Sequence, residues 1–168
     1  MNDEWQDIVN EDDIVIGKDT RENIWKKGLE SNTRVVNLFV VDKKNNILMP
    51  VRSSLKKKWP LCYDFACGEN VVSGETYEQA IIRGIREELG VSDIIPIEIS
   101  YLSPKNGVPC FMKNYKASVN LANFNPTVDL NEVDHFEWKN INEVKKMLSR
   151  STDNFKNGYK EVFNMSFR

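Results

Sequence analysis

One segment constrains the fold of this chain more than any other: residues 76–90, with the sequence TYEQAIIRGIREELG. Thr76 and Gln79 have the spacing of a capping box, which predicts that a helix begins at Tyr77. Gly90 is typical of a helix end, because glycine adopts left-handed backbone angles without steric cost. The segment therefore predicts one capped helix of about three to four turns.

The predicted helix has an apolar face and an acidic edge. With about 100° between successive residues, the apolar side chains at positions 81, 82, 85 and 89 share an arc that must face a core. Glu88 lies at the border of this arc, and Glu87 lies about 100° from it, away from the core. Gly84 lies between them in angle, although glycine inside a helix costs on the order of 1 kcal/mol relative to alanine. Either another group approaches the helix closely at Gly84, or the glycine is simply tolerated.

The composition favours one globular domain. The 168 residues are 40% hydrophobic and 10% aromatic, which is enough for a core. The formal net charge of -2 gives no global electrostatic case for binding nucleic acid. No apolar run approaches the roughly 18 residues of a membrane span, and the acidic N-terminus is not typical of a signal peptide. We therefore expect a cytoplasmic protein with neither a membrane nor a nucleic acid as its partner.

The order of the predicted elements indicates an α/β (α+β) fold. Strands are predicted at 34–42, 47–51, 61–67, 94–102, 110–121 and 135–140, and further helices at 141–150 and in the tail at 155–167. Near the N-terminus, residues 5–16 predict two short strands around a polar turn, and residues 21–30 predict one or two helical turns. We expect residues 1–32 to be an extension packed on a domain that spans residues 33–168.

Residues 69–91 resemble the Nudix box, G-x5-E-x7-R-E-U-x-E-E-x-G-U, in which U is an aliphatic residue. The matching residues are Glu75, Arg83, Ile85, Glu87, Glu88, Gly90 and Val91. The order of the neighbouring elements fits as well, over roughly residues 33–150. The resemblance implies a Nudix α/β/α sandwich with a mixed central sheet, to which the N-terminal strands are added.

Two positions depart from the box. Glu69 stands at the opening glycine, although Gly68 is next to it, and Gly84 stands at the glutamate that follows the box arginine. In the family that glutamate is often a metal ligand or the general base. The two departures leave open whether catalysis is retained, moved to another residue or lost.

The resemblance implies a divalent-metal-dependent hydrolase of an organic, nucleoside-type diphosphate linkage. Cleavage develops charge on phosphate oxygens, and a Mg²⁺ or Mn²⁺ ion held by carboxylates neutralises it and orients the attacking water. We expect Glu87 and Glu88 to be the catalytic metal ligands. Glu75, after Gly74, is expected to orient Arg83 and the loop before the helix, and these three residues are assigned structural roles.

A basic loop and a later carboxylate complete the predicted site. The sequence RSSLKKKWP at 52–60 resembles the R-R-x-x-x-K loop of the isopentenyl diphosphate isomerase branch, which implies that Arg52 and Lys56 bind the diphosphate. The alternative is a solvated basic loop. Since Gly84 lacks a carboxylate, Glu132 is our first candidate for the general base, and Glu137 is the second.

Two alternatives to hydrolysis accompany this hypothesis, and the oligomeric state is a separate open question. A Nudix-fold module could bind a phosphorylated ligand without hydrolysing it, and the N-terminal strands could pair with a second copy to form a homodimer. Isomerase activity is not expected, although residues 4–23 also resemble that branch. The isomerase cysteine and histidine positions fall on Gly68 and Asn70, a further histidine position falls on Thr33, and His135 is the chain's one histidine.

Overall fold

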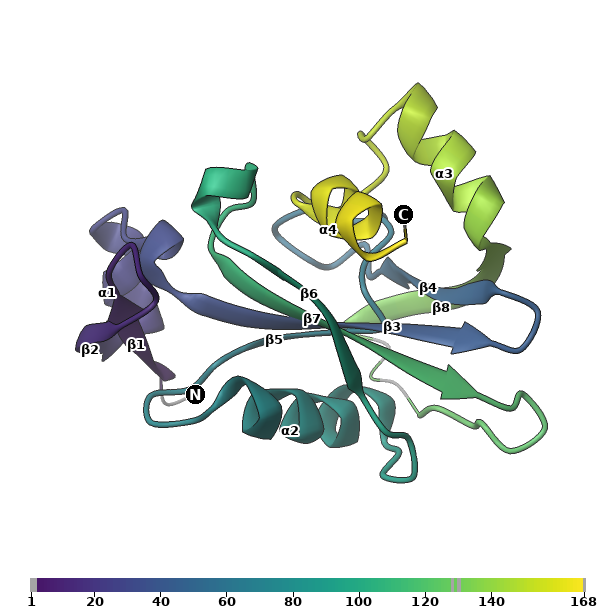
Figure 1. Cartoon of the computed structure of the whole chain (residues 1–168), viewed down its shortest axis with the longest axis horizontal. Coiled ribbons are helices and arrows are strands. Elements are labelled where there is room, and N and C mark those ends of the chain that lie inside the picture. The colour runs from purple at the N-terminus through teal and green to yellow at the C-terminus, as the bar shows by residue number, and fades with distance from the viewer. Residues whose placement is uncertain (1–2, 128, 130, 168) are drawn as a thin grey trace.

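A mixed β-sheet lies between two layers of helices, with a small hairpin at one end (Figure 1). The computed structural model describes residues 3–127, 129 and 131–167. The strands of the main sheet are β3 (Arg34–Asp42), β4 (Asn46–Arg52), β5 (Cys67–Asn70), β6 (Ile97–Leu102), β7 (Phe111–Val119) and β8 (Val133–Asn140). The covering helices are α2 (Tyr77–Leu89), α3 (Ile141–Arg150) and α4 (Tyr159–Ser166). The N-terminal elements are β1 (Trp5–Val9), β2 (Val15–Thr20) and α1 (Arg21–Lys26), and short 3-10 turns lie at Glu30–Asn32 and Pro104–Asn106.

The central strand β3 separates two cores. Its side chains alternate in direction, so Val36 and Leu38 pack with α2 while Phe39 packs with α4. On the α2 face the helix contributes Ile81 and Leu89, as its apolar arc predicts. The α/β/α sandwich with a mixed central sheet is therefore confirmed.

The two edges of β3 are paired differently. Along one edge β3 runs parallel to β7 from Arg34 to Asp42. Along the other edge β5 pairs antiparallel with the first half of β3, and β4 pairs with it only at Val41 among the described residues. Residues 53–66 leave the sheet where these two partner strands separate. The chain returns to the sheet at β5, and Asp64, just before this strand, lies near Glu88 at the end of α2.

Most predicted elements are confirmed with shifted ends, but the strand predicted at 61–67 is wrong. The strand in this region is β5, at Cys67–Asn70, and Tyr63 forms isolated bridges to Val51 and Phe155. Phe65 and Ala66 are buried without belonging to a ladder. Short apolar runs do not distinguish a strand from a packed loop, which explains the error.

The structure also bears on membrane insertion and on disulfide bonding. Within the described residues, no helix is both long and apolar enough to cross a membrane. The three cysteines, at positions 62, 67 and 110, are free thiols.

The N-terminal hairpin is tied to the main domain through Asp13. Its carboxylate lies 2.5 Å from Arg34 Nε at the start of β3, and it accepts hydrogen bonds from the hydroxyls of Tyr77 at 2.9 Å and Tyr101 at 3.2 Å. Asp13 has a φ of 61°, a left-handed conformation that Asp and Asn adopt more readily than most residues. One residue thus makes the turn of the hairpin and anchors it.

We predict that Asp13→Asn lowers the free energy of unfolding by about 1–3 kcal/mol, because Asn keeps the turn but leaves the Arg34 charge unpaired. Urea denaturation measures this change. The matched control is Asp12→Asn, at the exposed neighbouring position. Equal effects of the two substitutions would contradict the proposed anchor.

Candidate functional site

The adjacent glutamates near the end of α2 point in different directions. Glu87 is largely exposed, and its Oε2 accepts a hydrogen bond of 3.1 Å from Arg83 Nη1. Glu88 turns toward the sheet, where its Oε2 accepts a hydrogen bond of 3.2 Å from the backbone N–H of Gly68. Neighbouring helical residues differ by about 100° in direction, so the two predicted ligands do not face one another.

Arg83 connects the loop before α2 to β5. It donates to both carboxylate oxygens of Glu75, at 3.0 and 3.1 Å, to the Asn70 carbonyl at 2.8 Å and to Glu69 at 3.2 Å. Hydrogen bonding to Glu75 raises the pKa of Arg83, against the opposing effect of burial. Gly74, with a φ of 84°, allows the tight turn before the helix. Gly74, Glu75 and Arg83 therefore lie together at the entry to α2.

A second carboxylate lies beside Glu88. Burial raises the pKa of Glu88 well above its ordinary value, and hydrogen bonding with Glu69 raises it further. The positive charge of Lys156 acts in the opposite direction. Two carboxyl groups that repel each other when both are ionised are a pair that a cation would stabilise.

Cys67, on the same strand, is not suited to nucleophilic chemistry. Its side chain is buried, which raises the pKa of the thiol, and the charges of Glu88 and Glu69 raise it further. A thiol with a raised pKa stays protonated at neutral pH and is a poor nucleophile.

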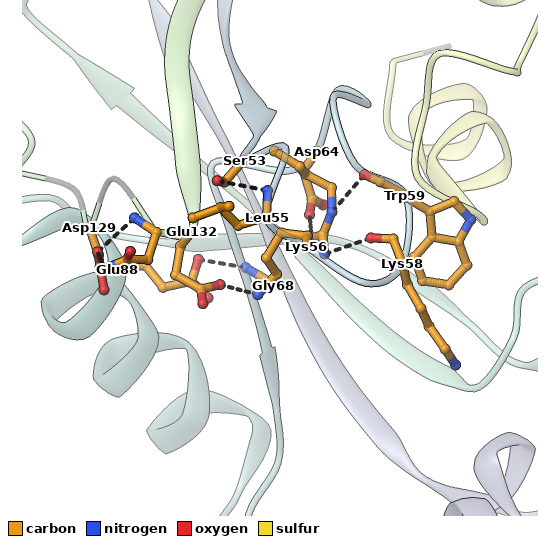
Figure 2. Close-up of polar contacts among 12 residues, drawn as sticks. Ser53, Leu55, Lys56, Lys58, Trp59, Asp64, Gly68, Glu88, Asp129 and Glu132 are labelled. Atoms are coloured by element: carbon orange, nitrogen blue, oxygen red, sulfur yellow. Dashed lines mark hydrogen bonds and ion pairs between the residues drawn. The ribbon is translucent and has the colours of Figure 1, made fainter.

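Arg52 holds the basic loop in place. Its Nη1 donates to Asp64 at 2.6 Å, and its other nitrogens donate to the carbonyls of Trp59 at 3.1 Å and Lys58 at 3.2 Å (Figure 2). Trp59 has a left-handed φ of 49°, an uncommon conformation for a bulky residue. Asp64 also pairs with Lys156 at 3.0 Å, and although burial would raise the pKa of Asp64, the charges of Lys156 and Arg52 hold it below its ordinary value. The contacts of Arg52 thus favour a role inside the loop, while its binding to a substrate remains a prediction.

Lys56 and Glu132 lie together at the rim of the site. The Lys56 ammonium forms an ion pair with the Glu132 carboxylate. Figure 2 shows the Lys56 side chain extending toward that carboxylate. The backbone N–H of Ser53 also donates to the Glu132 carbonyl at 2.9 Å. The structure therefore brings the predicted phosphate-binding lysine and the predicted base into contact, with Glu132 largely exposed.

The comparison with known proteins identifies the family. The NUDIX domain profile matches residues 31–159. The chain belongs to the Nudix family. An uncharacterized Nudix hydrolase from Nostoc sp. is 39% identical over 147 residues, which are 86% of this chain and 85% of that protein. The crystal structure of DR0079 from Deinococcus radiodurans has a TM-score of 0.87 at 28% identity, and the match covers 98% of this chain and 100% of that one.

A more distant relative belongs to the isomerase branch. Isopentenyl-diphosphate Delta-isomerase 2 of Photorhabdus laumondii is 26% identical over 160 residues, which are 94% of this chain and 89% of that protein. The similarity agrees with the resemblance of the N-terminal residues to this branch. At the site, however, Cys67 is buried and Gly68 and Asn70 stand at the positions of the isomerase cysteine and histidine.

The residues at this Nudix site fit a divalent cation. Nudix enzymes generally use divalent metals. In the described part of the chain, no group of three or more His, Cys, Asp or Glu side chains is arranged to hold a metal. Mg²⁺ nevertheless needs only one or two carboxylates, because waters and substrate phosphates supply its other ligands. The neighbouring carboxylates of Glu69 and Glu88 meet that requirement.

Sequence reasoning missed three residues of the site. Glu69 had a visible signal, since it departs from the box. Asp64 and Lys156 are far apart in sequence and carry no motif, so only the fold brings them together at 3.0 Å. The second candidate for a base, Glu137, has a pKa lowered to about 2, chiefly by hydrogen bonding from Lys139, which makes it a weak base.

We predict that Glu88→Gln stabilises the metal-free Nudix domain at neutral pH by about 0.5–2 kcal/mol. A carboxyl whose pKa is raised by folding holds a proton that the unfolded chain releases, so stability falls as pH rises above the unfolded pKa. The amide removes this loss.

Urea denaturation at pH 5 and pH 8, in the presence of a chelator, measures the effect. The advantage of the variant should grow with pH. The control is Glu78→Gln on the same helix, because hydrogen bonding to its own backbone N–H, together with Lys113, lowers the pKa of Glu78. A Glu88→Gln advantage that shrinks with pH would contradict the prediction.

Proposed function

We propose that this Nudix protein is a Mg²⁺- or Mn²⁺-dependent hydrolase of an organic, nucleoside-type diphosphate. The observation that carries the proposal is the partly buried Glu88 carboxylate at the end of the box helix, beside Glu69 and near the basic loop. When bound, the metal supplies positive charge that stabilises the developing charge on the phosphate oxygens. Glu88 holds this metal, and Glu87, close to it on the helix, remains a second proposed ligand.

The other residues position the substrate and move a proton. Lys56 contributes a point charge to the diphosphate, and Arg52 keeps the loop that carries Lys56 in place. A substrate phosphate that draws Lys56 away would free Glu132 from its ion pair. Glu132 then accepts a proton from the attacking water as the new P–O bond forms and the bridging P–O bond breaks. A diphosphate that joins two organic groups yields two organic monophosphates. A nucleoside diphosphate yields a nucleoside monophosphate and inorganic phosphate.

The first test is metal-dependent hydrolysis of a panel of nucleoside diphosphates, followed by ³¹P NMR. We expect Glu88→Gln to lower kcat/KM at least 100-fold, since it removes a metal ligand. The matched control is Glu78→Gln, on the first turn of the same helix, which should keep its activity. Full activity of Glu88→Gln would contradict the proposal.

A second test separates the two basic residues. Lys56→Ala should raise KM about tenfold with little change in stability, because its ion-pair partner Glu132 is largely exposed. Arg52→Ala should lower the free energy of unfolding by about 2–3 kcal/mol, because it breaks a largely buried pair. Thermal unfolding and steady-state kinetics measure both. The reverse pattern would assign the substrate contact to Arg52.

A binding module without catalysis is the second candidate, and the missing carboxylate at Gly84 favours it. Calorimetry with ADP and Mg²⁺ would then show binding, while ³¹P NMR of the same sample shows no hydrolysis. A labelled isomerisation assay is expected to give no product.

A further inference from the structure

The two departures from the Nudix box are reciprocal. The box has a glycine where this chain has Glu69, and a glutamate where this chain has Gly84. These positions lie on different elements, β5 and α2, and their separation in sequence gives no reason to connect them. The structure brings them into contact.

The Glu69 side chain occupies the space that a side chain at position 84 would need. A Cβ built on Gly84 would lie 2.6 Å from Glu69 Cγ and 2.7 Å from Cys67 Sγ. Real Cβ atoms do not come this close to neighbouring heavy atoms. Gly84 is therefore required by the side chains of β5, and the close approach considered for this glycine is observed.

The direction of Glu69 follows from the sheet. In the β3–β5 ladder Glu69 is opposite Val36, whose side chain packs in the core shared with α2. Side chains alternate along a strand, so Gly68 faces the other side, where its Cβ would meet Lys156 Nζ at 3.2 Å. Cys67 and Glu69 thus both face α2.

The carboxylate of Glu69 lies among the charged groups of the box. Its Oε2 is 3.2 Å from Arg83 Nη1, and its side chain is 19% exposed, which leaves it open to a small ligand. Glu88, one turn after Gly84 on the same helix, is its acidic neighbour.

We propose that Glu69 supplies from β5 the metal-ligating carboxylate that the Nudix box ordinarily carries on the helix at the position of Gly84. Glu69 and Glu88 then form the metal-binding pair. The proposal rests on the proposed function for the metal's presence, and it makes the glutamate–glycine exchange a relocation of the ligand, not a loss. The competing explanation is that Glu69 serves only as an ion-pair partner of Arg83.

An exchange experiment tests the relocation. The variants are Glu69→Gly, Gly84→Glu and the double variant, each compared with the wild type for Mn²⁺ affinity by calorimetry and for thermal unfolding. Glu69→Gly should weaken Mn²⁺ binding at least tenfold. Gly84→Glu should lower the unfolding temperature, because its side chain overlaps Glu69. The double variant should return Mn²⁺ affinity to within about threefold of the wild type. Its unfolding temperature should rise above that of Gly84→Glu but recover only in part, because Cys67 Sγ still lies 2.7 Å from the Cβ at position 84.

Glu69→Gln separates a ligand from an ion-pair partner and does not depend on the double variant folding. Its amide oxygen can still accept a hydrogen bond from Arg83, so the unfolding temperature should stay close to that of the wild type. Mn²⁺ affinity should still fall at least tenfold. Glu78→Gln is the control and should bind Mn²⁺ normally.

Wild-type Mn²⁺ affinity in Glu69→Gln and Glu69→Gly would overturn the relocation, even if the wild type hydrolyses diphosphates. Conversely, Mn²⁺ binding that depends on Glu69, in a protein that hydrolyses no diphosphate, would overturn the proposed function and support the relocation.

Discussion

The site depends on the close approach of β5 to α2 at Gly84. Because this helical residue has no side chain, the side chains of Cys67 and Glu69 lie directly against the helix. The same approach brings the Gly68 N–H to Glu88 and the Arg83 guanidinium to Glu69 and Asn70. A helix packed further away would make none of these contacts.

The charges along the contact between β5 and α2 are balanced differently at the start of the helix and near its end. Arg83 neutralises the entry to the helix, where Glu75 holds it through two hydrogen bonds. At the other end Glu88 and Glu69 share one region, and Lys156, which is also paired with Asp64, offsets them only in part. The domain therefore carries an excess of acidic groups where a cation is expected. Destabilised acidic pairs of this kind are common at functional sites, where stability is lower than the fold could provide.

The fold could be predicted because its signals are local. The capping box of Thr76 and Gln79, the glycine at 90 and the β-branched run of β3 each act within a few residues, and the structure has the predicted elements there. The strand at 61–67 could not be placed, because whether an apolar segment pairs with β3 depends on which partners β4 and β5 leave open. Arg52 was predicted to bind phosphate from the resemblance of its loop to the R-R-x-x-x-K loop. Its contacts with Asp64 and the loop carbonyls depend on chain segments that meet only after folding.

By itself, the sequence determined the helix, its caps, the acidic edge at Glu87 and Glu88, and the family resemblance, since all of these follow from the spacing of neighbouring residues. It also contained both halves of the glutamate–glycine exchange. Only the tertiary structure decided that Glu69 and Gly84 belong together, that Glu87 turns to Arg83 and that Glu88 turns inward. The physical reason is that these relations depend on the distance between a strand and a helix, which is set by the packing of the whole sheet and not by any one segment.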